Sequence, residues 1–371
     1  MIEVDKSRIK WVDNAKYILI MCVILLHLFN LPSSVETFIG SFTVPGFFFC
    51  AGYVYKHKCS LKIFLYNKFR SLFIPWLFFS NFNILLSHIF SFNIQDKLSV
   101  SLIKNMFQIR EYGDGLWFIS ALFIAFIPFY FVINLFKLKY IKEHKYGKYM
   151  PLFLSIVLLI VSLVYSYFMN STFFPWNNVN LPWHIEYIFI AVFFMVIGYY
   201  YRNYFESKLS LDRFLSFIII LFIYIIALAF KYMLLKNTFF VACFDKLTAV
   251  IGTMMIVNVS KMMKSNKYTS FIGQNTITYF AIHGKAISLL QNIIIKLFGN
   301  IYYNIINNYF LCLIFLVILT FITATVLIYP TIIIKKCLPF LYYNNQSKNR
   351  NTQFVVFLFF IALLYICIND L

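Results

Sequence analysis

The sequence predicts an all-α fold, a polytopic integral membrane helical bundle of about 10–11 transmembrane helices. Of the 371 residues, 62% are hydrophobic and only 12% are charged, a balance far outside the range of soluble proteins. Apolar runs long enough to span a bilayer recur along the chain. Backbone at membrane depth has no water to satisfy it, so these runs must be helices. They lie near residues 16–31, 39–55, 71–92, 115–136, 150–169, 184–201, 214–235, 239–258, 270–295, 309–334 and 352–369.

Two of these predicted spans have distinctive features. The first is short, roughly 24 Å long as a helix. The second contains Pro45, Gly46 and Gly52, residues that favour a kinked or re-entrant segment. The hydrophilic stretches between the runs are too short for a soluble domain, so we expect loops there.

The distribution of basic residues predicts the orientation of the spans. The formal net charge is +19, but the charges lie between apolar runs and form no single basic face, so we expect no nucleic-acid partner. With a cytoplasmic N-terminus, the inside segments hold 23 Lys and Arg residues and the outside segments hold 6. Because basic residues favour the cytoplasmic side, we expect a multi-pass protein of a bacterial inner or plasma membrane with its N-terminus in the cytoplasm.

The cysteines and short motifs indicate no metal centre. The seven Cys residues form no CxxC pair and no His/Cys ligand spacing, and most lie in apolar runs, where a free Cys acts as a small hydrophobic side chain. The sequence also contains no Walker A, GxGxxG, HExxH or GxSxG motif. The functional candidates are therefore the ionisable side chains within the apolar runs, because such residues are costly at membrane depth.

Two histidines and one lysine stand within the predicted spans. Lys16 and His27 are 11 residues apart, so they project from one helix face about 16 Å apart. His283 lies about 20 Å into the span that begins near Ser270, at a depth similar to that of His27. Either histidine could instead bond a neighbouring helix without a catalytic role.

Other ionisable residues near the membrane have plainer interpretations. His184, Glu186 and His88 lie near predicted boundaries, where we expect solvated loops. Lys246 is adjacent to Asp245 and is expected to point elsewhere, so we expect Asp245 to pair with another helix.

Five segments of the sequence form a recognisable series: RIKWVDNAKYILIMCVILLH, FTVPGFFFCAGYVYK, FLYNKFRSLFIPW, GLWFISALF and FIGQNTITYFAIH. In this order they resemble the motifs of the acyltransferase-3 family of membrane acyltransferases, with the fucose 4-O-acetylase-like subgroup most similar. The first motif of that family has a basic residue, ten residues and a histidine, matched here by Lys16 and His27. Three positions depart from the family pattern: Thr43 stands in place of a His, Ala51 in place of a Ser, and Asn67 in place of an Arg.

The resemblance covers nearly the whole chain. It implies a membrane-embedded acyltransferase-3-like domain over residues 8–335. Over residues 336–371 we expect a cytoplasmic loop and an extra C-terminal transmembrane helix.

The resemblance also implies a reaction: O-acetylation, in which acetyl passes from cytoplasmic acetyl-CoA to a hydroxyl of a cell-surface or lipid-linked glycan. The anionic coenzyme is expected to bind at Lys16, Lys68 and Arg70. His27 is expected to be the catalytic general base, and a transient acetyl-histidine is the other route that the residues allow. Asp13 is expected to orient Lys16.

Two further residues are expected to support this site, with Trp117 lining the acceptor path and His283 standing in the ninth span. The expected partners are the acceptor glycan or lipid-linked sugar, acyl-CoA, membrane lipids and the proteins of surface-polysaccharide (capsule or O-antigen) biosynthesis. Two alternatives stay open at this point. One is a glycan transporter or flippase, although no internal repeat supports it. The other is a non-catalytic member of a surface-polymer assembly system, a reading that Thr43 favours.

Overall fold

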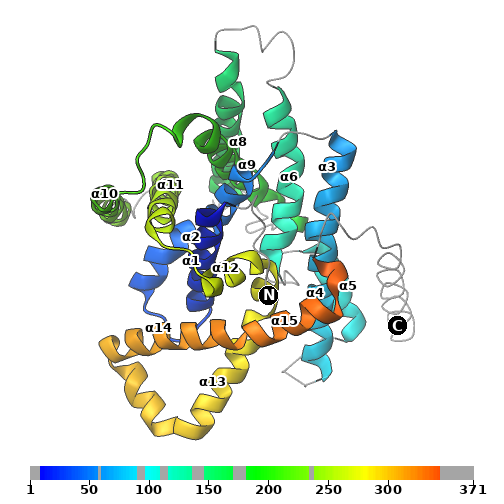
Figure 1. The fold of residues 1–371 in the computed structure, drawn as a ribbon, viewed down its shortest axis with the longest axis vertical. Helices are drawn as coiled ribbons and strands as arrows, with labels where there is room; N and C mark the ends of the chain where they lie inside the picture. The colour runs from blue at the N-terminus through cyan, green and yellow to red at the C-terminus, as the bar shows by residue number, and fades with distance from the viewer. Residues whose placement is uncertain are drawn as a thin grey trace. The chain divides into compact units, whose positions relative to one another are not determined.

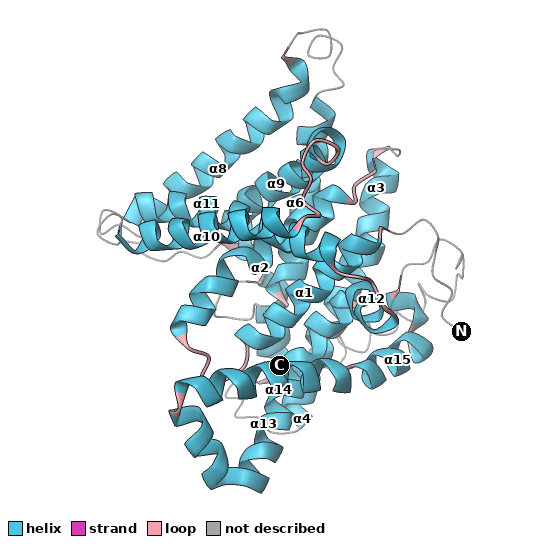
Figure 2. Ribbon diagram, turned by 60° about the vertical axis from the view of Figure 1, so that its left-hand side comes forward, coloured by secondary structure: helices cyan, strands magenta, loops and turns pink. Residues whose placement is uncertain are grey.

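The computed structural model describes residues 9–56, 60–89, 97–108, 116–135, 146–169, 181–233 and 238–342. Within these residues the chain is helical and contains no strand (Figure 2), which confirms the all-α prediction. The helices, with π and 3-10 segments labelled η, are α1 (Lys10–Leu26), α2 (Ser33–Tyr53), α3 (Leu61–Lys68), η1 (Phe69–Phe73), α4 (Ile74–Ile89), α5 (Leu98–Phe107), α6 (Trp117–Leu135), η2 (Gly147–Tyr149), α8 (Met150–Met169), η3 (Pro182–His184), α9 (Ile185–Tyr200), η4 (Tyr201–Phe205), α10 (Phe214–Met233), α11 (Thr238–Met262), α12 (Lys267–Gln274), α13 (Thr276–Asn307), α14 (Tyr309–Val326), α15 (Ile328–Cys337) and η5 (Pro339–Leu341).

Eight helical segments among the described residues are long and apolar enough to cross a membrane. They correspond to the predicted spans from the second to the eighth and to the tenth. The first predicted span corresponds to α1, which has 17 residues, and the ninth to the end of α12 and the first part of α13. The predicted span at 352–369 lies outside the described residues. The structure is thus an all-α, polytopic membrane bundle.

The chain forms two compact units, which are described separately below. The first unit consists of residues 1–56, 152–167 and 193–331, and the second of residues 57–151, 168–192 and 332–371.

Helix α1 lies in the interior of the first unit, where it packs against α2, α11, α12, α13 and α14 (Figure 1). Its buried side chains are distributed around the helix and do not form one stripe, as expected for a helix enclosed by others. The buried set includes Asp13 and Asn14. These polar side chains need partners in an apolar surrounding, so their contacts fix how α1 sits among its neighbours.

Helix α2 runs unbroken from Ser33 to Tyr53 through Pro45, so the second predicted span is not re-entrant. It approaches α9 very closely through two glycines. A Cβ on Gly52 would lie 1.8 Å from the carbonyl oxygen of Met195, and one on Gly198 would lie 2.1 Å from that of Phe49. Each glycine therefore faces backbone of the other helix, a contact that small residues permit in membrane bundles.

Helix α13 bends at Phe298, where φ is −128° and ψ is 21°. Beyond this bend the chain folds back into α14 (Figure 2). A hydrogen bond of 3.1 Å from Gln291 Nε2 to Tyr302 Oη connects the part of α13 before the bend to the part after it. The bend is thus held by a specific polar contact.

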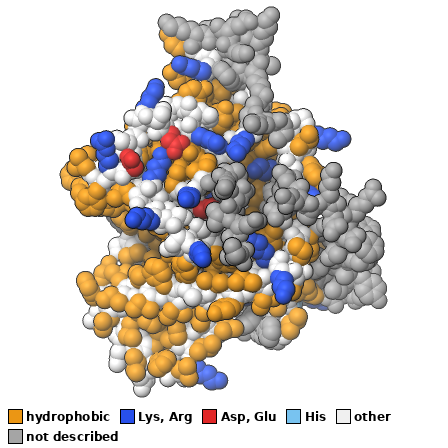
Figure 3. All heavy atoms as spheres, viewed as in Figure 1, with side chains coloured by type: hydrophobic (Ala, Val, Ile, Leu, Met, Phe, Trp, Pro, Cys, Tyr) orange, Lys and Arg blue, Asp and Glu red, His pale blue; other side chains and the backbone are white. Residues whose placement is uncertain are grey.

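Two helices of the first unit expose long apolar faces. On α14 the exposed side chains include Phe310, Leu311, Ile314, Val317 and Ile318, and Figure 3 shows this apolar surface over α14. On α10 they include Ile218, Ile219, Phe222, Ile223 and Ile226. Apolar faces of this extent suit contact with lipid.

In the second unit, α3, η1 and α4 form one helix from Leu61 to Ile89. Its middle turn, Phe69–Phe73, is a π-helix and carries Arg70. Such widened turns recur at functional sites. The π turn packs against α6, and α4 packs against α5, so the second unit is built around this long helix.

Candidate functional site

His27 and His283 lie together in the first unit. His27 is the C-terminal cap of α1 and is exposed, whereas His283 is buried on α13. The centroids of the two imidazole rings are 4.7 Å apart and the rings meet edge to face at 83°. The sequence predicted similar depths for these residues, but it placed His27 within the first apolar run. The structure places it at the end of the helix.

Hydrogen bonds orient both rings and fix their tautomers. His27 Nδ1 lies 2.8 Å from the carbonyl oxygen of Val23, and His283 Nδ1 lies 2.8 Å from that of Phe280. A carbonyl oxygen only accepts hydrogen bonds, so each neutral ring carries its proton on Nδ1. The Nε2 atom of each ring is then an acceptor. His283 Nε2 is buried and has no hydrogen-bond partner among the described residues.

The loop after His27 is anchored to α13 and α14. Asn30 adopts the left-handed conformation, with φ of 62°, and its Nδ2 donates to Tyr302 Oη at 3.3 Å. The thiol of Cys312 donates to the carbonyl oxygen of Asn30 at 3.6 Å. These contacts hold the chain that leaves His27 against the helix pair that follows His283.

The other end of α1 is clamped by α12 and by the end of α11. Gln274 Nε2 donates to Asp13 Oδ2 at 3.3 Å, and a Cβ on Gly273 would lie 2.0 Å from the Asp13 carbonyl oxygen. Asn14 Nδ2 donates to the carbonyl oxygens of Ser260 and Met263 at 3.2 and 2.8 Å. The segments RIKWVDNAKYILIMCVILLH and FIGQNTITYFAIH therefore contact each other at both ends of α1, at Asp13 and at His27.

Lys16 and Thr43 lie along the α1–α2 interface. Lys16 is half-buried, and both Lys16 and Asp13 act electrostatically on the thiol of Cys50 in α2. Thr43, which stands where the family usually has a histidine, is 1% exposed. Its hydroxyl donates to the Ile39 carbonyl oxygen at 2.6 Å and is within hydrogen-bond reach of Cys22. Position 43 is thus a tightly filled, small site.

Lys68, Arg70 and Trp117, the other predicted site residues, belong to the second unit. The Lys68 ammonium lies 3.8 Å from the ring centroid of Phe126 on α6, a cation–π contact. The Arg70 guanidinium is 6.0 Å from the ring centroid of Tyr66. Trp117 begins α6. Because these three residues lie in the other unit, their joint role with Lys16 in binding a coenzyme stays a prediction.

The structure corrects the interpretation of His184 and Glu186 as solvated loop residues. The His184 side chain is 3% exposed and that of Glu186 is 13% exposed. Both are covered because Trp183 and His184 form a tight turn that packs onto α6. Their order along the sequence, next to a tryptophan and before an apolar run, did not reveal this burial.

Sequence reasoning also missed a charged and aromatic cluster in the first unit. Glu206 accepts a hydrogen bond from Tyr53 Oη at 2.6 Å and pairs with Lys261 Nζ at 2.8 Å. The Lys261 ammonium lies 5.2 Å from the ring centroids of both Trp11 and Tyr201. Glu206 follows the π segment η4, whose widened turn closes with a bond from the Glu206 amide to the Tyr201 carbonyl. This cluster ties four helical segments together.

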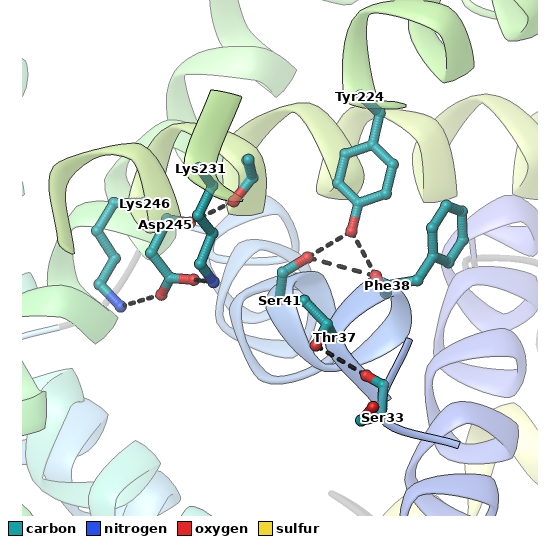
Figure 4. Close-up of polar contacts among 9 residues, drawn as sticks. Ser33, Thr37, Phe38, Ser41, Tyr224, Lys231, Asp245 and Lys246 are labelled. Carbon is teal, nitrogen blue, oxygen red and sulfur yellow. Dashed lines mark hydrogen bonds and ion pairs between the residues drawn. The ribbon is translucent and has the colours of Figure 1, made fainter. Parts of the chain in front are cut away.

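A second polar cluster joins α10 to α11 (Figure 4). Asp245 pairs with Lys231 of α10 at 2.6 Å, which confirms the expected pairing across helices. It also pairs with Lys246 at 3.0 Å, so the expectation that Lys246 points elsewhere is wrong. The long lysine side chain bends back to the neighbouring carboxylate. Nearby in the same view, the Tyr224 hydroxyl bonds to Ser41 and to the carbonyl oxygen of Phe38.

The fold and these contacts define a multi-pass helical membrane protein in which a pair of histidines lies at the end of an enclosed helix. The acyltransferase-3 family, described as an acyltransferase domain, matches residues 9–329. The chain belongs to this family and is a membrane acyltransferase. No curated protein and no solved structure matches it.

Proposed function

We propose that this acyltransferase moves acetyl from cytoplasmic acetyl-CoA to a hydroxyl of a cell-surface or lipid-linked glycan in the bacterial cell membrane, with its N-terminus in the cytoplasm. The observation that carries the proposal is the contact between His27 and His283. It joins the histidines of two family motifs from opposite ends of the chain, and one of the two rings is exposed.

In this proposal His27 Nε2 is the general base. It accepts the proton of the sugar hydroxyl while the hydroxyl oxygen attacks the thioester carbonyl carbon. The carbon–sulfur bond then breaks, the acetyl ester stays on the sugar, and the departing thiolate takes the proton back from His27. The bond from Nδ1 to the Val23 carbonyl supports this role, because it leaves Nε2 as the acceptor atom.

The basic residues predicted from the sequence supply the binding site for the acyl donor in this proposal. The phosphates of the coenzyme would be neutralised by Lys16, Lys68 and Arg70. A glycan-linked hydroxyl would arrive from the opposite side of the membrane. Capsule or O-antigen assembly is the setting that this acceptor implies.

The test measures O-acetyl content and total amount of surface glycan in a strain that lacks the gene, complemented by wild type, His27→Ala or Lys16→Ala. We expect His27→Ala to lower O-acetylation by about 100-fold or more, since a positioned base contributes roughly 10²–10⁴-fold. Lys16→Ala should mainly raise the KM for acetyl-CoA in membrane preparations.

His88→Ala is the matched control, because His88 Nδ1 bonds the Ile84 carbonyl one turn back, as His27 bonds Val23. It should retain wild-type O-acetylation. Wild-type O-acetylation by His27→Ala would refute the mechanism. Loss of the polymer itself from the strain lacking the gene, with no acetyl missing from the remainder, would indicate transport instead.

A further inference from the structure

Arg202 is a basic residue of the first unit that the proposed mechanism does not use. It lies on the π segment η4, directly after α9, and is half-buried. Its Nη1 donates a hydrogen bond to the carbonyl oxygen of Tyr53 at 3.1 Å, and its guanidinium carbon is 5.4 Å from the centroid of the Tyr53 ring. Both contacts fix the position of the guanidinium, but neither partner carries a negative charge.

The close approach of α2 and α9 places Arg202 at this position. A Cβ on Gly198 would lie 2.1 Å from the Phe49 carbonyl oxygen, so the two helices touch there without an intervening side chain. Arg202 follows Gly198, and Tyr53 follows Phe49, by about one helical turn. The arginine therefore reaches the last turn of α2, whose carbonyl oxygens have no partner within the helix.

The neighbouring carboxylate does not neutralise Arg202. Glu206 pairs with Lys261 at 2.8 Å and accepts a hydrogen bond from the Tyr53 hydroxyl at 2.6 Å. Within the part of the chain that the structure describes, no carboxylate lies within ion-pair distance of the Arg202 guanidinium. A guanidinium carries five N–H donors, and the bond to Tyr53 uses one of them. A partly accessible cation with unused donors is therefore held in a fixed orientation.

Arg202 lies near Lys16, which is predicted to bind the acyl donor. Lys16 acts electrostatically on the thiol of Cys50, which lies about one turn before Tyr53 on α2. In the predicted orientation α1 begins at the cytoplasmic side, and α2 and η4 end there. The cationic groups of Lys16 and Arg202 therefore border the last two turns of α2, on the side where a soluble donor arrives.

We propose that Arg202 binds a phosphate group of the acyl donor at the cytoplasmic end of the first unit. The planar guanidinium suits this ligand because two parallel N–H groups match the geometry of a phosphate. A phosphate would also supply the negative charge that the contacts with Tyr53 lack. This inference rests on the proposed acyl-CoA donor and adds a binding residue of the first unit to Lys16.

Two other roles of Arg202 predict different behaviour. As a helix cap alone, it would stabilise the end of α2 through the Tyr53 carbonyl without contacting a ligand. As a membrane anchor, it would contact the phosphate of an anionic lipid. Its partner Tyr53 packs edge to face on Trp11 of the enclosed helix α1, whereas α10 and α14 carry the long lipid-facing apolar faces of this unit. The soluble donor is therefore the source of the phosphate in this proposal.

Isothermal titration calorimetry of CoA with the purified full-length chain in an uncharged detergent tests the proposal. Arg202→Gln removes the charge but keeps an N–H donor for the Tyr53 carbonyl, so the cap is preserved. We expect this variant to bind CoA about 10–100-fold more weakly than wild type, since a hydrogen bond to a charged group corresponds to roughly that factor. Arg202→Lys should recover part of the binding, because it restores the charge but not the planar pair of donors.

Arg213→Gln is the matched control, because Arg213 is an exposed arginine of the same unit, directly before α10. It removes the same charge and should bind CoA like wild type. Size-exclusion profiles establish that the variants are folded, and native mass spectrometry measures the phosphatidylglycerol that each variant retains.

Three results would overturn the inference while leaving the proposed donor intact. Equal CoA binding by Arg202→Gln and wild type would leave only a capping role. Equal weakening by Arg213→Gln and Arg202→Gln would indicate a general effect of net charge. Loss of bound phosphatidylglycerol by Arg202→Gln, with CoA binding unchanged, would indicate a lipid anchor. Wild type that binds no CoA would overturn the inference together with the proposed donor.

Discussion

Replacing Gly52 by alanine should separate α2 from α9. The added Cβ would lie 1.8 Å from the Met195 carbonyl oxygen and 2.5 Å from its carbonyl carbon. Ordinary contact between carbon atoms is roughly 3.5 Å, so the helices must move apart by more than about 1 Å. No side-chain rotation relieves this clash, because the atoms that the methyl group meets belong to the backbone.

The magnitude follows from two opposing effects. Overpacking of this kind costs about 1–3 kcal/mol and occasionally more, and contact with backbone favours the upper end of that range. Alanine gains about 0.5–1 kcal/mol over glycine in a helix, so we expect a net loss of about 2 kcal/mol. For a unit of this size that corresponds to a melting temperature about 4–8 °C lower.

The assay is thermal unfolding of the purified chain in one detergent, followed by size-exclusion chromatography. Gly284→Ala is the matched control, because a Cβ on Gly284 meets no atom within 4 Å and the residue also lies within a helix. This control should unfold at the wild-type temperature or slightly above it. If Gly52→Ala is as stable as Gly284→Ala, the close packing of α2 on α9 is not needed for stability and the reasoning fails.

Two further predictions concern the interior of the first unit. Glu206→Gln keeps the side-chain shape but removes the charge that pairs with Lys261. Because these side chains are 26% and 15% exposed, we expect a loss of only about 1 kcal/mol. The melting temperature of the variant should also depend less on NaCl concentration than that of wild type, and an unchanged salt dependence would contradict this view of the pair. Thr43→His introduces the residue that the family usually has, but into a site that is 1% exposed and within hydrogen-bond reach of Cys22. The larger ring should therefore lower stability by about 1–3 kcal/mol, and higher acetyl transfer at unchanged stability would show that the site accommodates a histidine.

The helical fold was predictable from the sequence because a membrane allows so few backbone solutions. The long apolar runs correspond to helices wherever the structure describes them. The approach of His27 and His283 was predictable in part, since equal depth was expected of both. Depth along two helices does not state that those helices are neighbours, and contact required the packing of α1 against α13.

The residues that sequence reasoning missed are those whose partners come from distant segments. His184 was interpreted as a loop residue because it stands at a span boundary, yet tertiary contact with Trp117 on α6 buries it. Glu206 was not singled out because its partners Tyr53 and Lys261 are far from it in sequence. Polarity at a boundary is ambiguous in a sequence, because water and a neighbouring helix satisfy the same groups equally well.

Helix α1 is fixed at both ends, by Asp13 against Gly273 and by His27 against His283. The number of residues between these contacts therefore sets both the distance and the rotation about the helix axis that separate Asp13 from the His27 ring. Inserting or deleting one residue there would turn the imidazole by about 100° around the helix axis and shift it by about 1.5 Å, while the clamp at Asp13 held the other end in place. The number of residues between the two anchors of α1 therefore cannot change, which gives a geometric reason for a motif defined by spacing.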